Sequence, residues 1–248
     1  AKAQVSNVAY SDNQVRFTVI SESTVRLEYD PNGQFTDNKS FMAVVRAYDP
    51  VNYQLKQGSW IEITTPMLKL RYKKGSGAFT DKNLVITSAT KKKGSFQFTW
   101  KPGMKQQANL KGTFRTLDGY DGDVRTFDTP EGKKGEHMEI EDGVIARDGW
   151  TLIDDSQSLL FDGDPQWEWV TERKHRDGQD WYFMAYGTDY KRALKDYARF
   201  AGKMPLPPRY AFGYWWSRYW LYSDKEVRNL VKDLRNYGFP LDVLVIDM

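Results

Sequence analysis

The feature that most constrains the fold is the pattern of residues 207–248, which reads as a strand, a helix and a second strand. Ser223 and Glu226 form a capping box, the usual start of a helix, because each side chain satisfies a backbone N–H group that would otherwise lack a partner. Apolar residues then recur at helical spacing. Gly238 ends this helix, and Pro240 prevents it from resuming. The sequence therefore predicts a β-α-β unit here.

The second strand of this unit ends in a carboxylate. Residues 241–246 are a short, nearly continuous run of apolar and β-branched side chains, which is typical of a parallel strand buried on both faces. Asp247 follows where the strand ends, and in barrels and doubly wound sheets the carboxyl ends of strands carry the chemistry. Such a strand needs neighbours and covering helices, so we expect the chain to be a piece of a longer protein. A small terminal unit without a site is the alternative.

The first two thirds of the chain show a different pattern, that of short strands separated by turns. Alternating or apolar runs predict strands at residues 15–20, 25–29, 43–47, 60–64, 68–72, 84–87, 96–100 and 181–186. A polar, glycine-rich stretch at residues 110–142 predicts a long loop. Strands at this spacing with no helical stretch between them indicate an antiparallel β-sandwich.

A helix and a linker close this region. Thr188 is the expected helix cap and Gly202 the expected helix end. Residues 203–208 contain three prolines and cannot be regular structure, so they read as a linker. We therefore expect a mainly β chain with an N-terminal sandwich domain at 1–202, a linker at 203–208 and the truncated start of a second domain at 209–248.

Three segments carry a resemblance to a known family. Residues 209–218 (RYAFGYWWSR), 222–227 (YSDKEV) and 239–248 (FPLDVLVIDM) resemble, in order and in spacing, the start of the catalytic barrel of glycoside hydrolase family 31. That family contains α-glucosidases and α-xylosidases. The resemblance implies a galactose-mutarotase-like antiparallel sandwich followed by the first β-α-β of a (β/α)8 TIM barrel. It also implies a retaining α-glycosidase, with α-glucosides preferred over α-xylosides as terminal sugars cleaved from oligosaccharides.

The resemblance also assigns site residues. Both catalytic carboxylates of the family come from later barrel strands, so none is expected within residues 1–248. Asp247 matches an Asp that contacts the sugar in the subsite being cleaved. Asp148, which follows Arg147, is a looser match to a carboxylate that a sandwich loop offers over the barrel mouth. We expect Asp247 and Asp148 to flank the non-reducing sugar, with Asp148 closing a turn before Gly149 as the alternative.

Three further side chains lie on the first predicted barrel strand, namely Trp215, Trp216 and Arg218. Strand alternation sends neighbours to opposite faces, so at most one of the two Trp faces the barrel interior. We interpret all three as structural, with a pocket-lining role as the alternative. A buried Arg218 would need a carboxylate partner from the rest of the barrel.

Several chemistries are disfavoured. A net charge of +3 with mixed signs does not favour nucleic acid or a membrane surface, no apolar run has the length of a membrane span, and the absence of cysteine excludes disulfides and thiolate chemistry. Asp118, Asp121 and Asp123 do not fit a calcium-loop register. His137 and His175 lack partners at useful spacing, which argues against a mutarotase that uses a His acid. We therefore predict neither a metal nor a cofactor.

Two alternatives stay open. The chain could also be a non-catalytic carbohydrate-binding β-sandwich that is cut off within the following domain. Such a binding module does not require a capped β-α-β unit, which argues against this alternative. Alternatively, a companion fragment supplies the remainder of the catalytic barrel. The expected partners are an oligosaccharide or α-glycoside substrate and the rest of the barrel. Residues 1–4 lack the apolar core of a signal peptide, so the compartment stays open, with an exported (periplasmic or extracellular) protein preferred.

Overall fold

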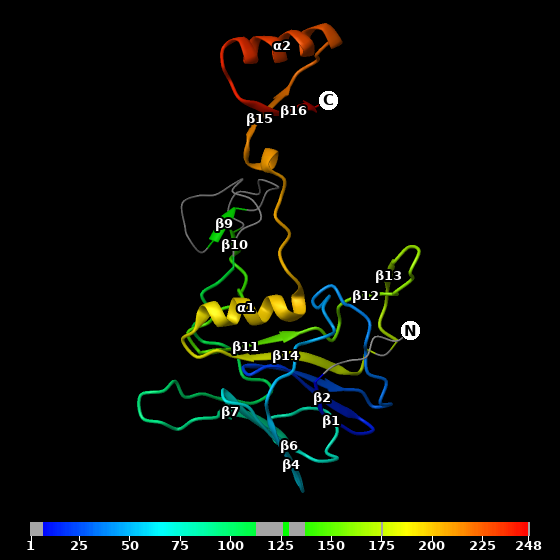
Figure 1. Ribbon diagram of the computed structural model, residues 1–248, viewed down its shortest axis with the longest axis vertical. Helices are drawn as coiled ribbons and strands as arrows, with labels where there is room; N and C mark the ends of the chain where they lie inside the picture. The colour runs from blue at the N-terminus through cyan, green and yellow to red at the C-terminus, as the bar shows by residue number, and fades with distance from the viewer. Residues whose placement is uncertain (1–6, 113–125, 129–136, 175, 248) are drawn as a thin grey trace. The chain divides into compact units, whose positions relative to one another are not determined.

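A computed structural model describes residues 7–112, 126–128, 137–174 and 176–247. The chain divides into two compact units, Ala1–Lys203 and Met204–Met248. The first is the sandwich unit and the second the C-terminal unit (Figure 1).

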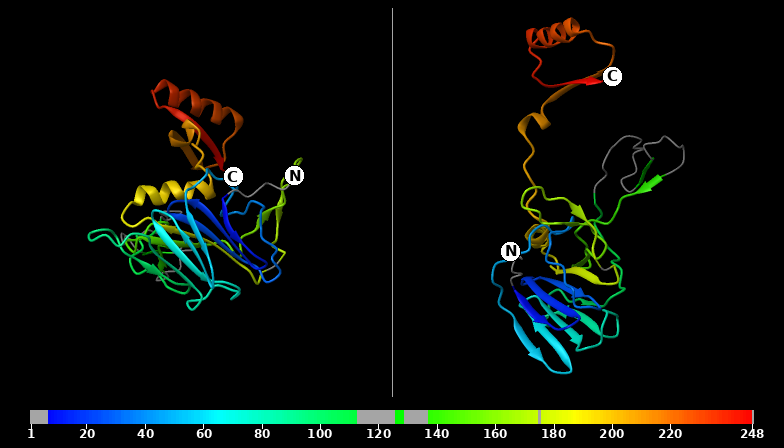
Figure 2. Two further views of the ribbon diagram at one scale, coloured as in Figure 1. Left: turned by 60° about the horizontal axis from the view of Figure 1, so that its bottom comes forward. Right: turned by 90° about the vertical axis from the view of Figure 1, so that its right-hand side faces the viewer.

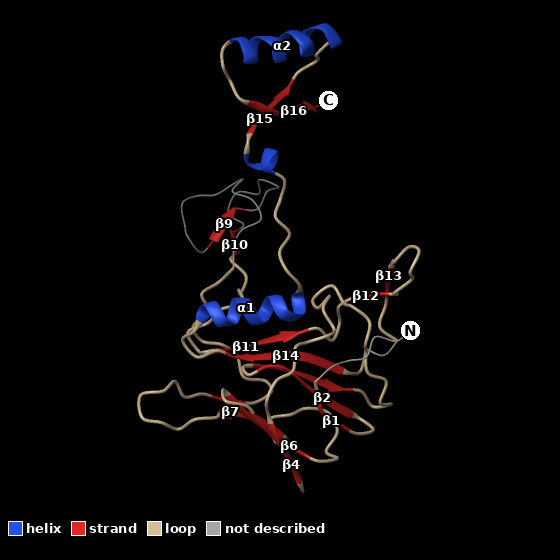
Figure 3. Cartoon of the chain, viewed as in Figure 1, coloured by secondary structure: helices blue, strands red, loops and turns tan. Residues whose placement is uncertain are grey.

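The sandwich unit consists mainly of two five-stranded antiparallel sheets. The first sheet has the order β1 (Val8–Ser11), β2 (Val15–Ser21), β3 (Thr24–Tyr29), β14 (Gln179–Ala185) and β11 (Trp150–Asp154). The second has the order β4 (Gln54–Gln57), β5 (Trp60–Thr64), β6 (Leu68–Lys73), β7 (Leu84–Ser88) and β8 (Thr99–Trp100). Neighbouring strands are antiparallel in both sheets, which confirms the predicted mainly β, antiparallel class (Figure 3).

One hydrophobic core joins the two sheets. Phe17, Leu27 and Phe183 of the first sheet pack in the same buried cluster as Tyr72 and Trp100 of the second. The rings of Trp100 and Phe183 have their centroids 4.8 Å apart. Because alternate residues of each strand point into this shared layer, the arrangement is a β-sandwich (Figure 2).

Helix α1 (Tyr190–Ala201) covers the other face of the first sheet (Figure 1). Phe200 of this helix stacks on Tyr182 of β14, with ring centroids 4.3 Å apart, inside a second buried cluster. The helix begins one residue later than predicted, since the Asp189 side chain, rather than Thr188, caps it by accepting the N–H group of Arg192. Gly202 ends the helix as predicted.

The strand predicted at residues 43–47 is wrong. This segment crosses the face of the first sheet beside α1, and its backbone and side chains bond to that layer instead of to a strand. The N–H group of Val45 donates to the carbonyl of Phe200, and Ala43 is fully buried in the cluster beneath the helix. Ala43 and Arg46 are its buried residues, whereas Val44 is 38% exposed, so the apolar run resembles a strand in sequence although its backbone bonds to Ser40 and Phe200 and not to a neighbouring strand.

Other boundaries differ less. Strands β1 and β4 were not predicted, and the strand predicted at residues 96–100 is reduced to Thr99–Trp100. Two short hairpins complete the described strands: β9 (Thr126–Asp128) with β10 (His137–Glu139), and β12 (Leu160–Phe161) with β13 (Val170–Thr171). Three aspartates considered above for a calcium loop lie outside the described residues, namely Asp118, Asp121 and Asp123. His175 lies outside them as well.

The C-terminal unit is the predicted β-α-β arrangement. A short 3-10 helix η1 (Arg209–Phe212) precedes β15 (Tyr214–Tyr219), α2 (Asp224–Asn236) and β16 (Leu241–Asp247). The two strands pair in parallel, and the capping box at the start of α2 is formed in both directions. The complete barrel remains a prediction. Among the described residues, no helix has the length and apolar character needed to cross a membrane.

Candidate functional site

Asp247 lies at the end of β16, opposite Tyr219 at the end of β15. The two strands run in parallel, so their carboxyl ends share one edge of the sheet. The side chain of Asp247 is exposed at this edge. The structure thus places this carboxylate where chemistry is expected in a parallel sheet.

The other predicted side chains of this unit lie along β15. The indole N–H group of Trp215 donates to the carbonyl of Tyr210 at 3.2 Å. Trp216 is half-buried, whereas the guanidinium of Arg218 is exposed and lies over the ring of Trp220, 4.5 Å from its centroid. Neighbours alternate between the two faces of the strand, so Trp216 and Arg218 share a face and Trp215 lies on the other. Which face lines a pocket stays a prediction.

Asp148 lies in the sandwich unit, in the turn before β11. Its half-buried carboxylate accepts the backbone N–H groups of Gln107, at 3.1 and 3.2 Å, and of Ala108, at 2.8 Å. Gly149 follows with φ +75°, and a Cβ there would lie 2.2 Å from the ring of Phe96. These contacts give the carboxylate a structural role, since it ties this turn to residues 107 and 108. Contact with a sugar stays a prediction, as does the pairing of Asp148 with Asp247.

The turn that carries Asp148 is also held from its other side. The hydroxyl of Tyr186 accepts the N–H group of Ala146 at 2.7 Å and shares a hydrogen bond of 2.8 Å with the hydroxyl of Thr151. Thr151 in turn donates to the carbonyl of Val144. Asp148 therefore stands on a rigid support, which is the condition for a side chain to bind with defined geometry.

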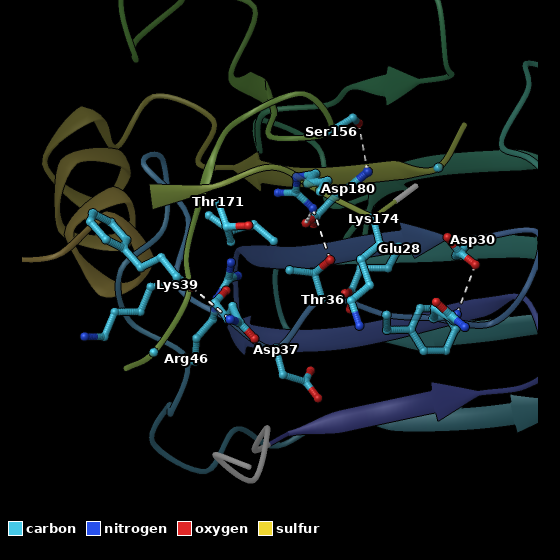
Figure 4. A pocket seen from close by; sticks show the side chains of 18 of the residues that line it. Glu28, Asp30, Thr36, Asp37, Lys39, Arg46, Ser156, Thr171, Lys174 and Asp180 are labelled. Carbon is cyan, nitrogen blue, oxygen red and sulfur yellow. Dashed lines mark hydrogen bonds and ion pairs between the residues drawn. The ribbon is translucent and has the colours of Figure 1, made fainter. Parts of the chain in front are cut away.

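A groove of about 1180 Å³ in the sandwich unit was not predicted from the sequence. It lies over the end of β3 and is bordered by residues 33–39, 156–163 and 168–174, and Figure 4 shows Glu28, Asp37, Lys39 and Asp180 around it. Among the described residues that line it, seven are acidic and five are basic. This balance does not suit a strongly anionic ligand.

The floor of the groove is a network of buried ion pairs. Arg26, with 1% of its surface exposed, donates to both carboxylate oxygens of Asp180 at 2.8 Å. Arg16 binds Glu28 at 2.7 Å, and Arg173 donates to Asp180 at 3.0 Å. The arginines at the floor are thus held by carboxylates of the protein itself, and the floor is rigid.

Burial and neighbouring charges shift the pKa values of the Glu28 and Asp180 carboxyl groups in opposite directions. Burial raises the pKa of Glu28, against the opposing influence of Arg26 and Arg16. Burial also acts to raise the pKa of Asp180, but the guanidinium groups of Arg26 and Arg173 outweigh it and hold that pKa well below its usual range. Asp180 is therefore the anion that the network stabilises.

The sequence held one signal of this network. Arg16 and Glu28 are direct partners across β2 and β3, and Thr18 and Arg26 follow in the same register. Opposite charges at facing positions of a hairpin indicate a cross-strand pair. The alternation itself predicts only strands, because nothing in the pattern shows that residues 33–39 and Asp180 cover the polar face.

A family model described as the "Glycosyl hydrolases family 31 TIM-barrel domain" matches residues 204–248. Two curated relatives match a similar length of chain. An alpha-xylosidase of Saccharolobus solfataricus is 38% identical over 66 residues, which is 27% of this chain and 9% of that protein. Alpha-glucosidase 2 of Bacillus thermoamyloliquefaciens is 37% identical over 67 residues, or 27% of this chain and 8% of that protein. The matches therefore span less than a tenth of these relatives.

Solved structures resemble nearly the whole chain. A GH31 dextranase of Flavobacterium johnsoniae, in complex with isomaltotriose, has a TM-score of 0.52 at 19% identity, over 96% of this chain and 32% of that one. A GH31 alpha-xylosidase from a soil metagenome, in complex with xylose, has a TM-score of 0.53 at 12% identity, over 97% of this chain and 40% of that one. At these identities the likeness concerns the fold alone.

Proposed function

Since the chain belongs to glycoside hydrolase family 31, we propose that it is the N-terminal part of a retaining α-glycosidase of the α-glucosidase type. The proposed reaction is the hydrolysis of terminal α-linked sugars from oligosaccharides. The observation that carries the proposal is the parallel β-α-β unit, matched by the family model, with Asp247 at the end of its second strand.

The surface of the C-terminal unit supports the proposal that the rest of a barrel is its partner. Tyr219 is 76% exposed and Ile246 is 73% exposed, although both lie on parallel strands. Parallel strands normally occur with both faces covered. Further strands and helices, from the same polypeptide or from a companion fragment, would bury these side chains.

Residues 1–248 are proposed to contribute to substrate binding and not to the bond-breaking step. Retaining hydrolysis requires two carboxyl groups about 5 Å apart, one as nucleophile and one as acid and then base. We propose that both come from strands outside residues 1–248. An ionised carboxylate such as Asp247 accepts hydrogen bonds from adjacent sugar hydroxyls and fixes the ring for attack. Asp148 is proposed to contact the substrate as well.

Hydrolysis by the complete polypeptide tests the proposal. We expect 4-nitrophenyl α-glucoside to be cleaved with a higher kcat/KM than 4-nitrophenyl α-xyloside. Replacement of Asp247 by Ala should lower kcat/KM by about tenfold to a hundredfold, because a charge-assisted hydrogen bond to the sugar is lost. Asp233→Ala, at an exposed position of α2, is the matched control. An unchanged KM and kcat in the Asp247 variant would contradict the assignment of this residue.

The groove of the sandwich unit favours a second candidate function, the binding of an oligosaccharide without catalysis. Arg16 and Arg173 are paired with carboxylates, whereas Thr36, Asn38 and Thr171 bring hydroxyl and amide groups to the lining. Phe35, with Arg16 over its ring, and Phe161, which packs on Phe41, bring partly covered rings. Neutral hydroxyl-rich ligands bind through such a combination of polar groups and apolar ring faces.

Calorimetric titration of the chain with maltotriose tests this candidate. We expect Thr171→Tyr, which fills the groove, to abolish binding, and Thr99→Tyr, on an exposed strand position of the other sheet, to leave it unchanged. Inorganic phosphate should not compete, because the lining carries more acidic than basic side chains. Binding that survives in the Thr171 variant would eliminate the groove as the site.

A further inference from the structure

The pairing of β15 with β16 contains an irregularity at its start. Tyr214 pairs with Leu241, but the next residue of β15, Trp215, pairs with Val243. Asp242 is therefore an extra residue in β16, as in a β-bulge. From there the register is regular up to the last pair, Tyr219 with Asp247.

The side chain of Asp242 fills the gap that the irregularity leaves. Its Oδ2 accepts the backbone N–H group of Tyr214 at 2.9 Å. The Asp242 carboxylate thus replaces the backbone carbonyl group of β16 that would accept this N–H group in a regular ladder. Hydrogen bonds from a backbone N–H group to a charged carboxylate are stronger than neutral ones.

Gly213 is matched to this carboxylate. A Cβ at Gly213 would lie 2.1 Å from Oδ2 of Asp242 and 2.3 Å from its Cγ. The backbone of Gly213, with φ −86° and ψ −165°, is extended and suits any residue. Glycine is therefore required at this position by the neighbouring carboxylate and not by the backbone conformation.

The consequence concerns Asp247, five residues further along β16. A strand that slips by one residue turns every side chain to the opposite face. If β16 paired without the extra residue, Ile246 would stand opposite Tyr219, and Asp247 would move past the end of β15. The position of Asp247 at the edge of the sheet therefore depends on the register that begins at Asp242.

We propose that Gly213 and Asp242 form a register lock, with Asp242 as the positioning residue that sets Asp247 for substrate binding. This inference rests on the proposed function of Asp247. The lock itself is a property of the strand pair and has consequences for stability that do not depend on any substrate.

The stability test uses thermal unfolding of the complete polypeptide. Gly213→Ala should lower the unfolding midpoint by about 5 °C, because its Cβ meets the carboxylate. In an Asp242→Gly background, Gly213→Ala should cost much less, since the Oδ2, Cγ and Cβ atoms that an added Cβ would meet at 2.1, 2.3 and 2.7 Å are then all absent. Gly58→Ala, where the nearest atom to an added Cβ is 3.9 Å away, is the matched control. An equal loss with and without Asp242 would disprove the lock.

The activity test is a double-mutant cycle on kcat/KM for 4-nitrophenyl α-glucoside. Asp242→Ala should lower kcat/KM by about tenfold or more, and Asp242→Asn, which keeps an acceptor oxygen, should restore most of it. In the Asp247→Ala background, Asp242→Ala should change kcat/KM by less than about twofold. Independent, multiplicative losses would overturn the positioning role. If Asp247→Ala itself has no effect, the proposed function of Asp247 fails and the positioning role with it, whereas the stability cycle still reports on the lock.

Discussion

Asp180 is the residue on which the buried charge network of the sandwich unit converges. Its carboxylate accepts three hydrogen bonds from Arg26 and Arg173, and its backbone N–H group donates to the hydroxyl of Ser156. Removing one partner of such a network leaves the other charges buried and uncompensated. The network therefore fixes β3, β14 and the groove above them more by the cost of disrupting it than by its net attraction.

Replacing Asp180 by Asn should lower the free energy of unfolding at pH 7 by about 3–5 kcal/mol. The pKa of Asp180 is depressed in the fold, so its stabilisation is complete above the unfolded value of about 3.9 and is lost as pH falls toward the folded value. The difference between wild type and variant should thus shrink below about pH 4. Urea unfolding at several pH values measures it, with the exposed Asp177→Asn as control. A difference independent of pH would contradict this role.

Asp148 is the site residue of the sandwich unit whose carboxylate already has partners within the fold. Its oxygens accept N–H groups from Gln107 and Ala108, but an ionised carboxylate has about four lone-pair positions and retains capacity for a sugar hydroxyl. The support from Tyr186 and Thr151 would hold it in place for that contact.

The Asn and Ala variants of Asp148 separate these contacts from the proposed contact with a sugar. Asp148→Ala should lower the free energy of unfolding by about 1–2 kcal/mol, because two backbone N–H groups lose their acceptor, and Asp148→Asn should lose less. In the complete polypeptide, Asp148→Asn should nevertheless raise KM several-fold, since an amide accepts sugar hydroxyls more weakly than a carboxylate. A normal KM in the stable Asp148→Asn variant would show that Asp148 holds the turn and does not bind the substrate.

At the scale of elements, α1 is fastened to the first sheet by a buried carboxylate. Asp196 accepts hydrogen bonds from the hydroxyls of Ser21, at 2.9 Å, Thr24, at 3.2 Å, and Ser23. These three hydroxyls lie at the turn between β2 and β3, so the contact joins the helix to the turn of a hairpin far away in sequence. Apolar packing of Phe200 on Tyr182 provides the second attachment.

Replacing Asp196 by Ala should lower the free energy of unfolding by about 1–3 kcal/mol, because buried hydroxyl donors lose their acceptor. Amide hydrogen exchange should accelerate most in α1, the element that this carboxylate attaches. Lys195→Ala, at an exposed position of the same helix, provides the comparison. Uniform exchange in both variants would show that the hydroxyls find other partners and that packing alone holds α1.

The elements differ in how well the sequence predicts them, for physical reasons. The capping box at Ser223 and the glycine at 238 define α2 because they act locally. Residues 43–47 were predicted as a strand because their apolar run has the composition of one, and nothing local in the sequence shows that the N–H group of Val45 bonds to Phe200 of α1 instead. The cap of α1 is one residue away from Thr188 because Asp189 competes for the same backbone donors.

For the molecule as a whole, strand spacing was sufficient to predict a mainly β, antiparallel sandwich, and the capping box with helical periodicity was sufficient to predict a β-α-β unit. The groove could not be predicted, because Arg16, Asp37 and the pair of Arg173 and Asp180 come together from three separate segments of the chain. For the candidate site, the position of Asp247 followed from a local strand pattern. The contacts of Asp148 with residues 107 and 108 depend on tertiary structure and had no signal in the sequence.

We propose that the chain is the front part of a retaining α-glycosidase. Proton NMR of the sugar released from 4-nitrophenyl α-glucoside by the complete polypeptide, recorded before mutarotation equilibrates the product, reports the stereochemistry of the reaction. A retaining mechanism predicts that the α-anomer of glucose appears first. Initial release of the β-anomer, or the absence of hydrolysis of both the α-glucoside and the α-xyloside, would contradict the claim.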